Sequence, residues 1–457
     1  MTRFLVALAA ASMAVVVPAA QQSPASPSLP AEMPATAAAC VKQVRDYVAA
    51  GSQALGIGPN AAGPTTAAVA ARLQQMRAPA QAFALRCAAQ FPAASVREDE
   101  LADLVALYDL GQTAINPETV ATRTSALDRI LSAKSLPPAA RLDMLKTLFS
   151  VTRMSYGTTT RDERRVGVYP LVERISDAVD AMPEATPALR LSFHQSALGR
   201  YRGDDIDSGI IKHATWILGA MKDVPVADRK KPAFMAPYID MAEAWAGQGR
   251  TADALDLLKK GAAEFADVPR ASEEFDPEIA RLELVGHAAP AVVAPRWLNA
   301  AAGTKDMALD GHVTLLEFTA HWCGPCRESY PGVNRMRAEL GPRGFQVVLV
   351  TQLYGFFKAE RALDAATEIT RDTGYFKEFG MDVPIAIGDE VHAKVANGQI
   401  VYDPPGPDPN DTHYQVTGIP QIQIVDRHGV IRRILVGYDT ANEPALAAFI
   451  RTLLDEH

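Results

Sequence analysis

Apolar side chains recur every three or four residues through most of the chain between residues 40 and 285. Leu171, Ile175 and Val179, for example, fall on one face of a helix with 3.6 residues per turn. Loop signals such as Pro137-Pro138 separate these runs, whereas runs of Val, Ile and Thr bounded by turn residues are scarce. The pattern predicts an all-helical domain over residues 40–285.

One stretch of this domain, residues 236–265, resembles a single tetratricopeptide helix–turn–helix unit. Trp245, Gly247 and Ala254 stand near the places where that repeat has Trp, Gly and Ala. A solenoid needs at least three repeats to bury a continuous core. An ordinary helical bundle explains these residues equally well, and both alternatives stay open.

A different pattern begins after Leu284. Short apolar runs bounded by turn residues predict strands at residues 313–318, 345–351, 422–425 and 430–436. Helical periodicity predicts helices at residues 323–340, 357–370 and 442–454. We therefore predict that an all-helical N-terminal domain is followed by an α/β domain over residues 286–457, with a long insertion before Pro420.

The first 20 residues have the pattern of a secretory signal peptide. Arg3 precedes an uncharged apolar run from Phe4 to Val17, and small residues follow it. The alternative is an uncleaved membrane anchor, although this run is short for a bilayer span of about 20 residues. Residues 21–39 are rich in Pro, Ser and Ala and are predicted to be a linker. We expect an exported protein, located in the periplasm.

Composition narrows the classes of function. The chain has 457 residues, of which 48% are hydrophobic, and this fraction is ordinary for a globular protein. The length suggests about three folding units. The net charge of −8 argues against nucleic acid as a partner. Four cysteines are too few for a disulfide scaffold but sufficient for specific chemistry.

Cys40 and Cys87 both fall in the first predicted helical hairpin. In an oxidising compartment we expect a structural disulfide that joins the two helices. Such a cross-link stabilises the fold by about 4 kcal/mol in the chain-entropy description. The alternative is a pair of buried free thiols.

The other two cysteines, Cys323 and Cys326, form a Cys-x-x-Cys pair where a predicted strand meets a predicted helix. Cysteines three residues apart at a helix N-terminus share one face and can form a small disulfide ring. The first thiol lies at the positive end of the helix dipole, which favours its thiolate. We expect Cys323 to be the nucleophile, and Cys326, one turn inside the helix, to resolve a mixed disulfide.

The Cys-x-x-Cys pair has two other possible interpretations. A Cys-x-x-Cys pair forms half of a zinc site only if two further ligands exist. The chain has no second such pair, although His321, His392 and His413 could in principle complete a site. A purely structural disulfide is the second reading, and it does not account for Trp322 and for Gly324-Pro325. We predict no metal and no cofactor.

The segment Gly311–Arg327 resembles the active-site signature of the thioredoxin superfamily, and most closely that of the TlpA-type exported thiol–disulfide oxidoreductases. The resemblance covers residues 286–457. Pro331 stands where that family kinks its active-site helix. Thr417–Gln421 is similar to the family's cis-proline loop. The resemblance implies a thioredoxin-like fold for residues 286–457.

Two further site residues follow from this resemblance. Glu317 stands where many relatives hold a buried acid, and there it would accept a proton from Cys326 near neutral pH. The alternative is a Glu that reaches solvent or an Arg. Pro420 would form a cis peptide bond beside the cysteines and leave the backbone of Ile419 free to pair with an extended substrate. The alternative is an ordinary trans proline at a strand start.

The resemblance implies thiol–disulfide exchange with protein substrates that carry disulfides. Gly324-Pro325 between the cysteines matches the reducing members of the superfamily, and a reductase of this kind needs a membrane electron-donor protein to recharge it. A disulfide oxidase or isomerase is one alternative. A scaffold that binds a partner through its helical domain is another. The client, the role of the helical domain and the oligomeric state are not predicted.

Overall fold

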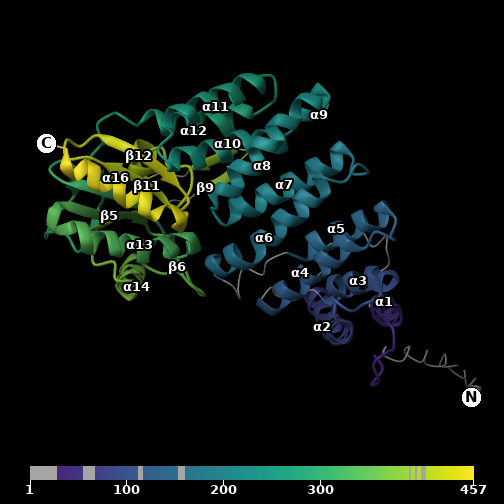
Figure 1. Ribbon diagram of the computed structural model, residues 1–457. Coiled ribbons are helices and arrows are strands. Elements are labelled where there is room, and N and C mark those ends of the chain that lie inside the picture. Colours follow the sequence, from purple (N-terminus) through teal and green to yellow (C-terminus); the bar gives the residue numbers. More distant parts are fainter. Residues whose placement is uncertain are drawn as a thin grey trace, which may run out of the picture. The chain divides into compact units, whose positions relative to one another are not determined.

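The computed structural model describes residues 28–54, 67–111, 117–152, 160–390, 393–396, 399–402 and 408–456. The predicted signal peptide and the first part of the predicted linker lie outside these residues. The chain divides into two compact units, one ending at Ala185 and one beginning at Thr186 (Figure 1). None of the helices in the described part of the chain has both the length and the apolar character needed to cross a lipid bilayer.

The first unit is built from helices. Its elements are α1 (Ala37–Ala54), α2 (Ala67–Gln90), η1 (Glu98–Glu100), α3 (Leu101–Gly111), α4 (Pro117–Ser132), α5 (Pro138–Val151) and α6 (Arg161–Asp180). Apolar side chains at helical spacing, such as Leu101, Leu104 and Tyr108 of α3, are buried. A disulfide joins Cys40 of α1 to Cys87 of α2.

The second unit begins with helices as well. They are α7 (Pro187–Gly203), α8 (Asp207–Ala220), η2 (Met221–Asp223), α9 (Val226–Arg229), α10 (Pro232–Gly247), α11 (Thr251–Glu264) and α12 (Ala271–Glu283). Tyr238, Phe265 and Phe275 make ring contacts at centroid distances of 6.1–6.4 Å, which fasten α10, the end of α11 and α12 together. From Ala37 to Glu283 the described residues contain helices and turns but no strand.

A six-stranded mixed sheet follows in the same unit. Its strands, in spatial order, are β12 (Ile431–Val436), β11 (Gln421–Val425), β4 (Val313–Phe318), β5 (Phe345–Gln352), β8 (Ile385–Gly388) and β2 (Arg296–Leu298). β4, β5 and β8 are parallel, whereas β11, β12 and β2 pair antiparallel with their neighbours. All six residues of the central strand β4 are buried, as expected for a strand that is covered on both faces.

Helices α13 (Gly324–Leu340), α14 (Ala365–Glu378) and α16 (Glu443–Asp455) supply the other part of this core. Tyr330 of α13, Phe376 of α14 and Ile450 of α16 belong to one buried cluster with the side chains of the sheet. The smaller elements are β1 (Val292–Val293), β3 (Asp306–Met307), η3 (Gly341–Arg343), β6 (Phe356–Phe357), β7 (Glu360–Arg361), β9 (Ala393–Ala396), β10 (Gln399–Tyr402), α15 (Pro409–His413) and η4 (Thr440–Asn442).

The predicted helix at residues 357–370 is wrong at its start. Residues 356–361 form the two-stranded hairpin β6–β7, and Lys358 and Ala362 have positive φ angles of 53° and 54° that interrupt a helix. The helix begins at Ala365, where the Asp364 side chain accepts a hydrogen bond from the Thr367 N–H at 2.9 Å.

The helices of the second unit pack directly on the edge of the sheet. Helix α10 contacts β12, and the Asn442 amide donates a 2.7 Å hydrogen bond to Asp207 at the start of α8. The Tyr438 N–H donates to the Asp205 carboxylate at 3.3 Å. The predicted boundary between residues 285 and 286 therefore lies inside the second unit.

Candidate active site

The Cys-x-x-Cys pair lies where β4 passes into α13. Cys323 is the N-cap of the helix, and its sulfur accepts a hydrogen bond from the Cys326 N–H at 3.1 Å. Gly324 and Pro325 are the first two helical residues, where the missing N–H of proline leaves no hydrogen bond unmade. The two sulfurs form a disulfide, with 5.3 Å between the Cα atoms.

The two cysteines differ little in burial, although the sequence predicts that Cys323 is the more exposed of the two. Cys323 is 3% exposed and Cys326 is fully buried. The residue before them, Trp322, is half exposed and makes an edge contact with the ring of Tyr354 at a centroid distance of 5.5 Å. A large apolar side chain therefore lies on the surface next to a disulfide that solvent barely reaches.

Glu317 lies on β4 and is completely buried. Its Oε1 accepts a hydrogen bond from the Ser329 hydroxyl at 2.9 Å, while Oε2 has no hydrogen-bond partner in the described part of the chain. Burial raises the pKa of Glu317 to about 8, and the Ser329 hydrogen bond opposes this rise. Glu317 does not reach solvent, and no Arg pairs with it among the described residues.

Ser329 lies between this carboxyl group and the backbone of Cys326. Its hydroxyl lies 2.9 Å from Glu317 and 2.7 Å from the carbonyl oxygen of Cys326, and the side chain is buried. Ser329 is not among the site residues predicted from the sequence. Its spacing of three residues from Cys326 places it on the same helix face, and this was the signal that could have found it.

Pro420 immediately precedes β11, at the end of the sheet from which the cysteine segment leaves. The Ile419–Pro420 peptide bond is cis. The register pairs Gln421 with Phe318, the last residue of β4. Ile419 packs against the buried cluster that contains Cys323 and Cys326. The structure thus brings this loop and the two cysteines to one region.

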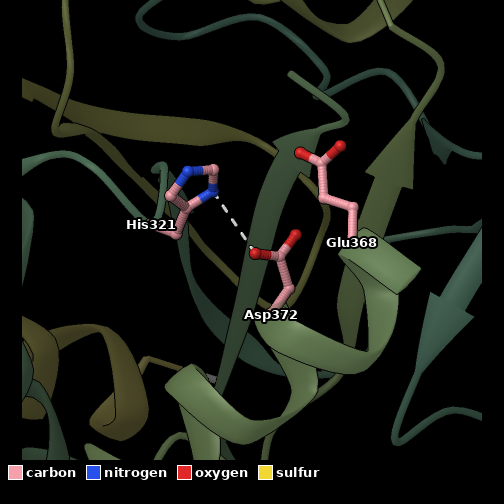
Figure 2. A group of neighbouring side chains, drawn as sticks. All are labelled: His321, Glu368 and Asp372. Carbon is pink, nitrogen blue, oxygen red and sulfur yellow. Dashed lines mark ion pairs between the residues drawn. The ribbon is translucent and has the colours of Figure 1, made fainter. Parts of the chain in front are cut away.

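Of the three histidines that could complete a zinc site, the two that the structure describes form no metal-type cluster with the cysteines. His392 lies outside the described residues, and His413 is the exposed last residue of α15. His321 points instead toward two carboxylates of α14, Glu368 and Asp372 (Figure 2). This group, which contains neither cysteine, is the one set of clustered metal-type ligands among the described residues.

Comparisons with known proteins give partial matches. No family model matches the chain, and no curated protein matches it. Three solved structures match part of the chain, and each match covers 37% of this chain and 96–98% of the solved one. They are a thiol:disulfide interchange protein DsbE from Chlorobium tepidum, a thiol-disulfide isomerase from Corynebacterium glutamicum, and a thioredoxin family protein from Chlorobium tepidum TLS.

The first of these structures is 29% identical, with a TM-score of 0.27, and the match covers 37% of this chain and 97% of that one. The second is 21% identical, with a TM-score of 0.27, covering 37% and 98%. The third is 17% identical, with a TM-score of 0.24, covering 37% and 96%. All three similarities concern little more than a third of the chain.

Proposed function

We propose that this chain is a thioredoxin-like thiol–disulfide oxidoreductase that acts on disulfides in protein substrates. The observation that carries the proposal is the disulfide at the start of α13 together with a fully buried Glu317, whose hydrogen-bond donor Ser329 lies one turn along the helix from Cys326. A purely structural cross-link does not need an acid of raised pKa beneath it. Catalytic groups, in contrast, commonly have perturbed pKa values.

The first step of the reaction uses the reduced pair. The Cys323 thiolate attacks one sulfur of the substrate disulfide, forms a mixed disulfide, and releases the second substrate sulfur as a thiolate that takes up a proton. The N-terminus of α13 and the N–H of Cys326 both favour negative charge on this sulfur. These groups lower the free energy of the attacking thiolate.

The second step uses Cys326. Ionised Glu317 takes the proton of the Cys326 thiol, and the resulting thiolate attacks the Cys323 sulfur. The Cys323–Cys326 disulfide forms, and the substrate leaves with its second thiol. Two electrons have then passed from the chain to the substrate. A pKa of about 8 keeps Glu317 close to the pH at which a general base is most effective.

The surroundings of the pair favour an extended polypeptide as substrate. Trp322 offers a half-exposed apolar ring beside the disulfide. Ile419, before the cis proline, offers backbone groups at the open end of β11. Main-chain hydrogen bonds of this kind give affinity for a peptide without strict demands on its sequence.

For the direction of transfer we favour reduction, because Gly324 and Pro325 lie between the cysteines. The reduced pair must then be regenerated by a dithiol donor, for which we propose a membrane electron-transfer protein. A redox titration of the purified chain against glutathione or dithiothreitol tests the direction. A potential near −270 mV fits a reductase, whereas one near −120 mV fits an oxidase.

For the location we favour export to the periplasm, with residues 1–20 as the signal peptide. The Cys40–Cys87 disulfide supports this location, since such bonds persist mainly outside the cytoplasm. Cell fractionation followed by N-terminal sequencing of the mature chain tests both points. A mature protein that begins at Met1 in the cytoplasm would contradict them.

The function itself is tested by trapping. Cys326→Ser removes the resolving thiol, so that mixed disulfides with substrates accumulate on Cys323. The matched control is Cys323→Ser with Cys326→Ser, which cannot form them. If the trap stays empty in the native compartment while the chain still binds a partner non-covalently, the chain is a binding scaffold rather than an oxidoreductase.

A further inference from the structure

A second group of buried polar side chains lies beside the cysteine segment. His321 comes two residues before Cys323, and Glu368 and Asp372 lie one turn apart on one face of α14 (Figure 2). These three residues are 6%, 1% and 1% exposed. Each offers one ligand atom, and these atoms all lie within 4.8 Å of one another.

The spacing between His321 and Asp372 fits a shared cation better than a direct hydrogen bond. The His321 Nδ1 and the Asp372 Oδ1 are 3.3 Å apart, whereas a charged N–H···O bond is about 2.7–2.9 Å long. In the described part of the chain, no hydrogen-bond partner exists for either ring nitrogen of His321 or for the Oδ1 atom of Asp372. Two ligands held at about 2.1 Å by one tetrahedral ion lie about 3.4 Å apart.

Glu368 is held in place by the backbone. The N–H groups of Tyr354 and Gly355 donate to its two oxygens at 2.7 and 2.8 Å. A carboxylate oxygen has two lone pairs, so one N–H donor on each leaves acceptor capacity for an ion. Backbone donors of this kind act as the outer-shell partners that orient metal ligands.

The charges of this group also favour a bound cation. Two carboxylates are buried here, and the one ion pair that either of them makes among the described residues is that of Asp372 with His321. Burying a carboxylate is costly unless a charge or several hydrogen bonds compensate for it. A divalent ion bound to two carboxylates and a neutral imidazole leaves the site without net charge.

We infer that His321, Glu368 and Asp372 bind one divalent transition-metal ion of the Zn²⁺ class. One imidazole nitrogen and two carboxylate oxygens suit Zn²⁺, whereas Mg²⁺ prefers oxygen ligands alone. Three protein ligands leave a fourth position for water. The rings of Tyr354, Phe356 and Phe357, at 5.0–5.5 Å from that of His321, shield the site from solvent.

Such an ion ties the segment that leads into the cysteine pair to helix α14. His321 follows β4, while its two partners come from the stretch between β7 and β8, about 50 residues later in the sequence. The ion has no part in the exchange of disulfides. The inference therefore does not depend on the proposed function, and the two can fail separately.

The test uses the tag-free full chain with Cys323→Ser and Cys326→Ser, so that no active-site thiol can bind metal. After EDTA treatment, Zn²⁺ is titrated by calorimetry, and the bound metal is measured by mass spectrometry after dialysis. We expect one Zn²⁺ per chain and no competition from a hundredfold excess of Mg²⁺. His321→Gln and Asp372→Asn should weaken binding more than the 10- to 100-fold, roughly, that loss of an outer-shell partner costs.

Two substitutions serve as matched controls. His413→Gln and Glu378→Gln change exposed residues of the same types outside the group and should leave binding unchanged. X-ray absorption of the Zn²⁺-loaded protein needs no ligand variant, so it remains informative if a variant fails to fold. A shell of nitrogen and oxygen with one imidazole supports the site.

Three outcomes would overturn the inference. The first is a folded chain that binds no Zn²⁺ at micromolar concentrations. The second is binding that persists in both ligand variants, and the third is a Zn²⁺ shell that contains sulfur or several imidazoles. In each of these cases His321 and Asp372 are an ion pair without a metal.

Discussion

The chain contains two disulfides that are nearly equal in burial and opposite in setting. Cys40 and Cys87, both fully buried, connect two helices across 47 residues of sequence. Cys323 and Cys326 are separated by three positions in the sequence and close a small ring at the first turn of one helix. Burial alone therefore does not separate a structural cross-link from a reactive one.

The difference lies in the groups around each bond. The first disulfide joins the apolar faces of α1 and α2 and closes a long loop, which is the arrangement that restricts the unfolded chain most. The second closes a short loop and restricts it little. It has instead a helix N-terminus, a half-exposed Trp322 and the buried acid Glu317 nearby. The first arrangement favours stability, and the second fits the reactivity that we propose.

The largest expected effect is on exchange itself. Cys323→Ser should lower disulfide reduction to the uncatalysed background, because the attacking thiolate is gone. The same assay on Cys40→Ser with Cys87→Ser should give the wild-type rate. If the second variant loses activity to the same extent while remaining folded, the assignment of reactivity to one disulfide and stability to the other is wrong.

The next effect is on stability, for which the Cys40–Cys87 bond should matter more than the Cys323–Cys326 bond. Removing the Cys40–Cys87 bond should lower the free energy of unfolding by about 4 kcal/mol, and removing the Cys323–Cys326 bond by about 2 kcal/mol, according to loop length. Urea unfolding followed separately for each unit measures both values. Equal losses would show that loop closure does not distinguish the two bonds.

Glu317→Gln should slow resolution of the mixed disulfide by about 100-fold at neutral pH, since a general base contributes roughly 10²–10⁴-fold. The wild-type rate should rise with pH through about 8, as Glu317 loses its proton, and this rise should disappear in the variant. Stopped-flow measurement between pH 6 and pH 9 records both. A variant that keeps the rise places the base elsewhere.

The same substitution changes how stability depends on pH. The folded pKa of Glu317 is raised from 4.5 to about 8, so the folded state binds the extra proton between these values. The contribution of Glu317 to the free energy of unfolding is fully present below pH 4.5 and is lost as the pH rises toward 8. Glu317→Gln should flatten this decline, and thermal unfolding from pH 4 to pH 9 measures it.

The smallest effect is expected for Ser329→Ala. The Ser329 hydroxyl lowers the pKa of Glu317, so its loss should move the rate profile to higher pH. Resolution at pH 7 should slow by about tenfold, which corresponds to the lower end of the roughly 1.5–3 kcal/mol contributed by a hydrogen bond to a charged group. In the Glu317→Gln background the same change should have almost no effect. Additive effects in the double variant would show that Ser329 acts independently of the acid.

The local sequence pattern was enough to predict much of the secondary structure. Strand β4 and helix α13 follow from an apolar run and from Cys323 and Pro325 at a helix start, and the structure places them at residues 313–318 and 324–340. Hydrophobic periodicity also led to helices throughout residues 40–285. These features depend on neighbours in the sequence.

Two kinds of feature were not predicted, namely one local hairpin and the contacts between residues that are far apart in the sequence. Hairpin β6–β7 replaces the expected start of a helix because backbone turns at Lys358 and Ala362 prevail over helical periodicity. The contact of His321 with Asp372 joins positions 51 residues apart through the packing of α14, which no local pattern contains. The packing of α10 on β12 is of the same kind.

That packing decides how the molecule can be divided. Strand β12 forms one edge of the sheet, and its Leu435 shares a cavity wall with Ala244 and Gly247 of α10. A fragment cut at residue 286 would leave that edge bare, with unpaired backbone groups and apolar side chains open to aggregation. A soluble fragment should instead begin at Thr186, so that the helices travel with the strand they cover.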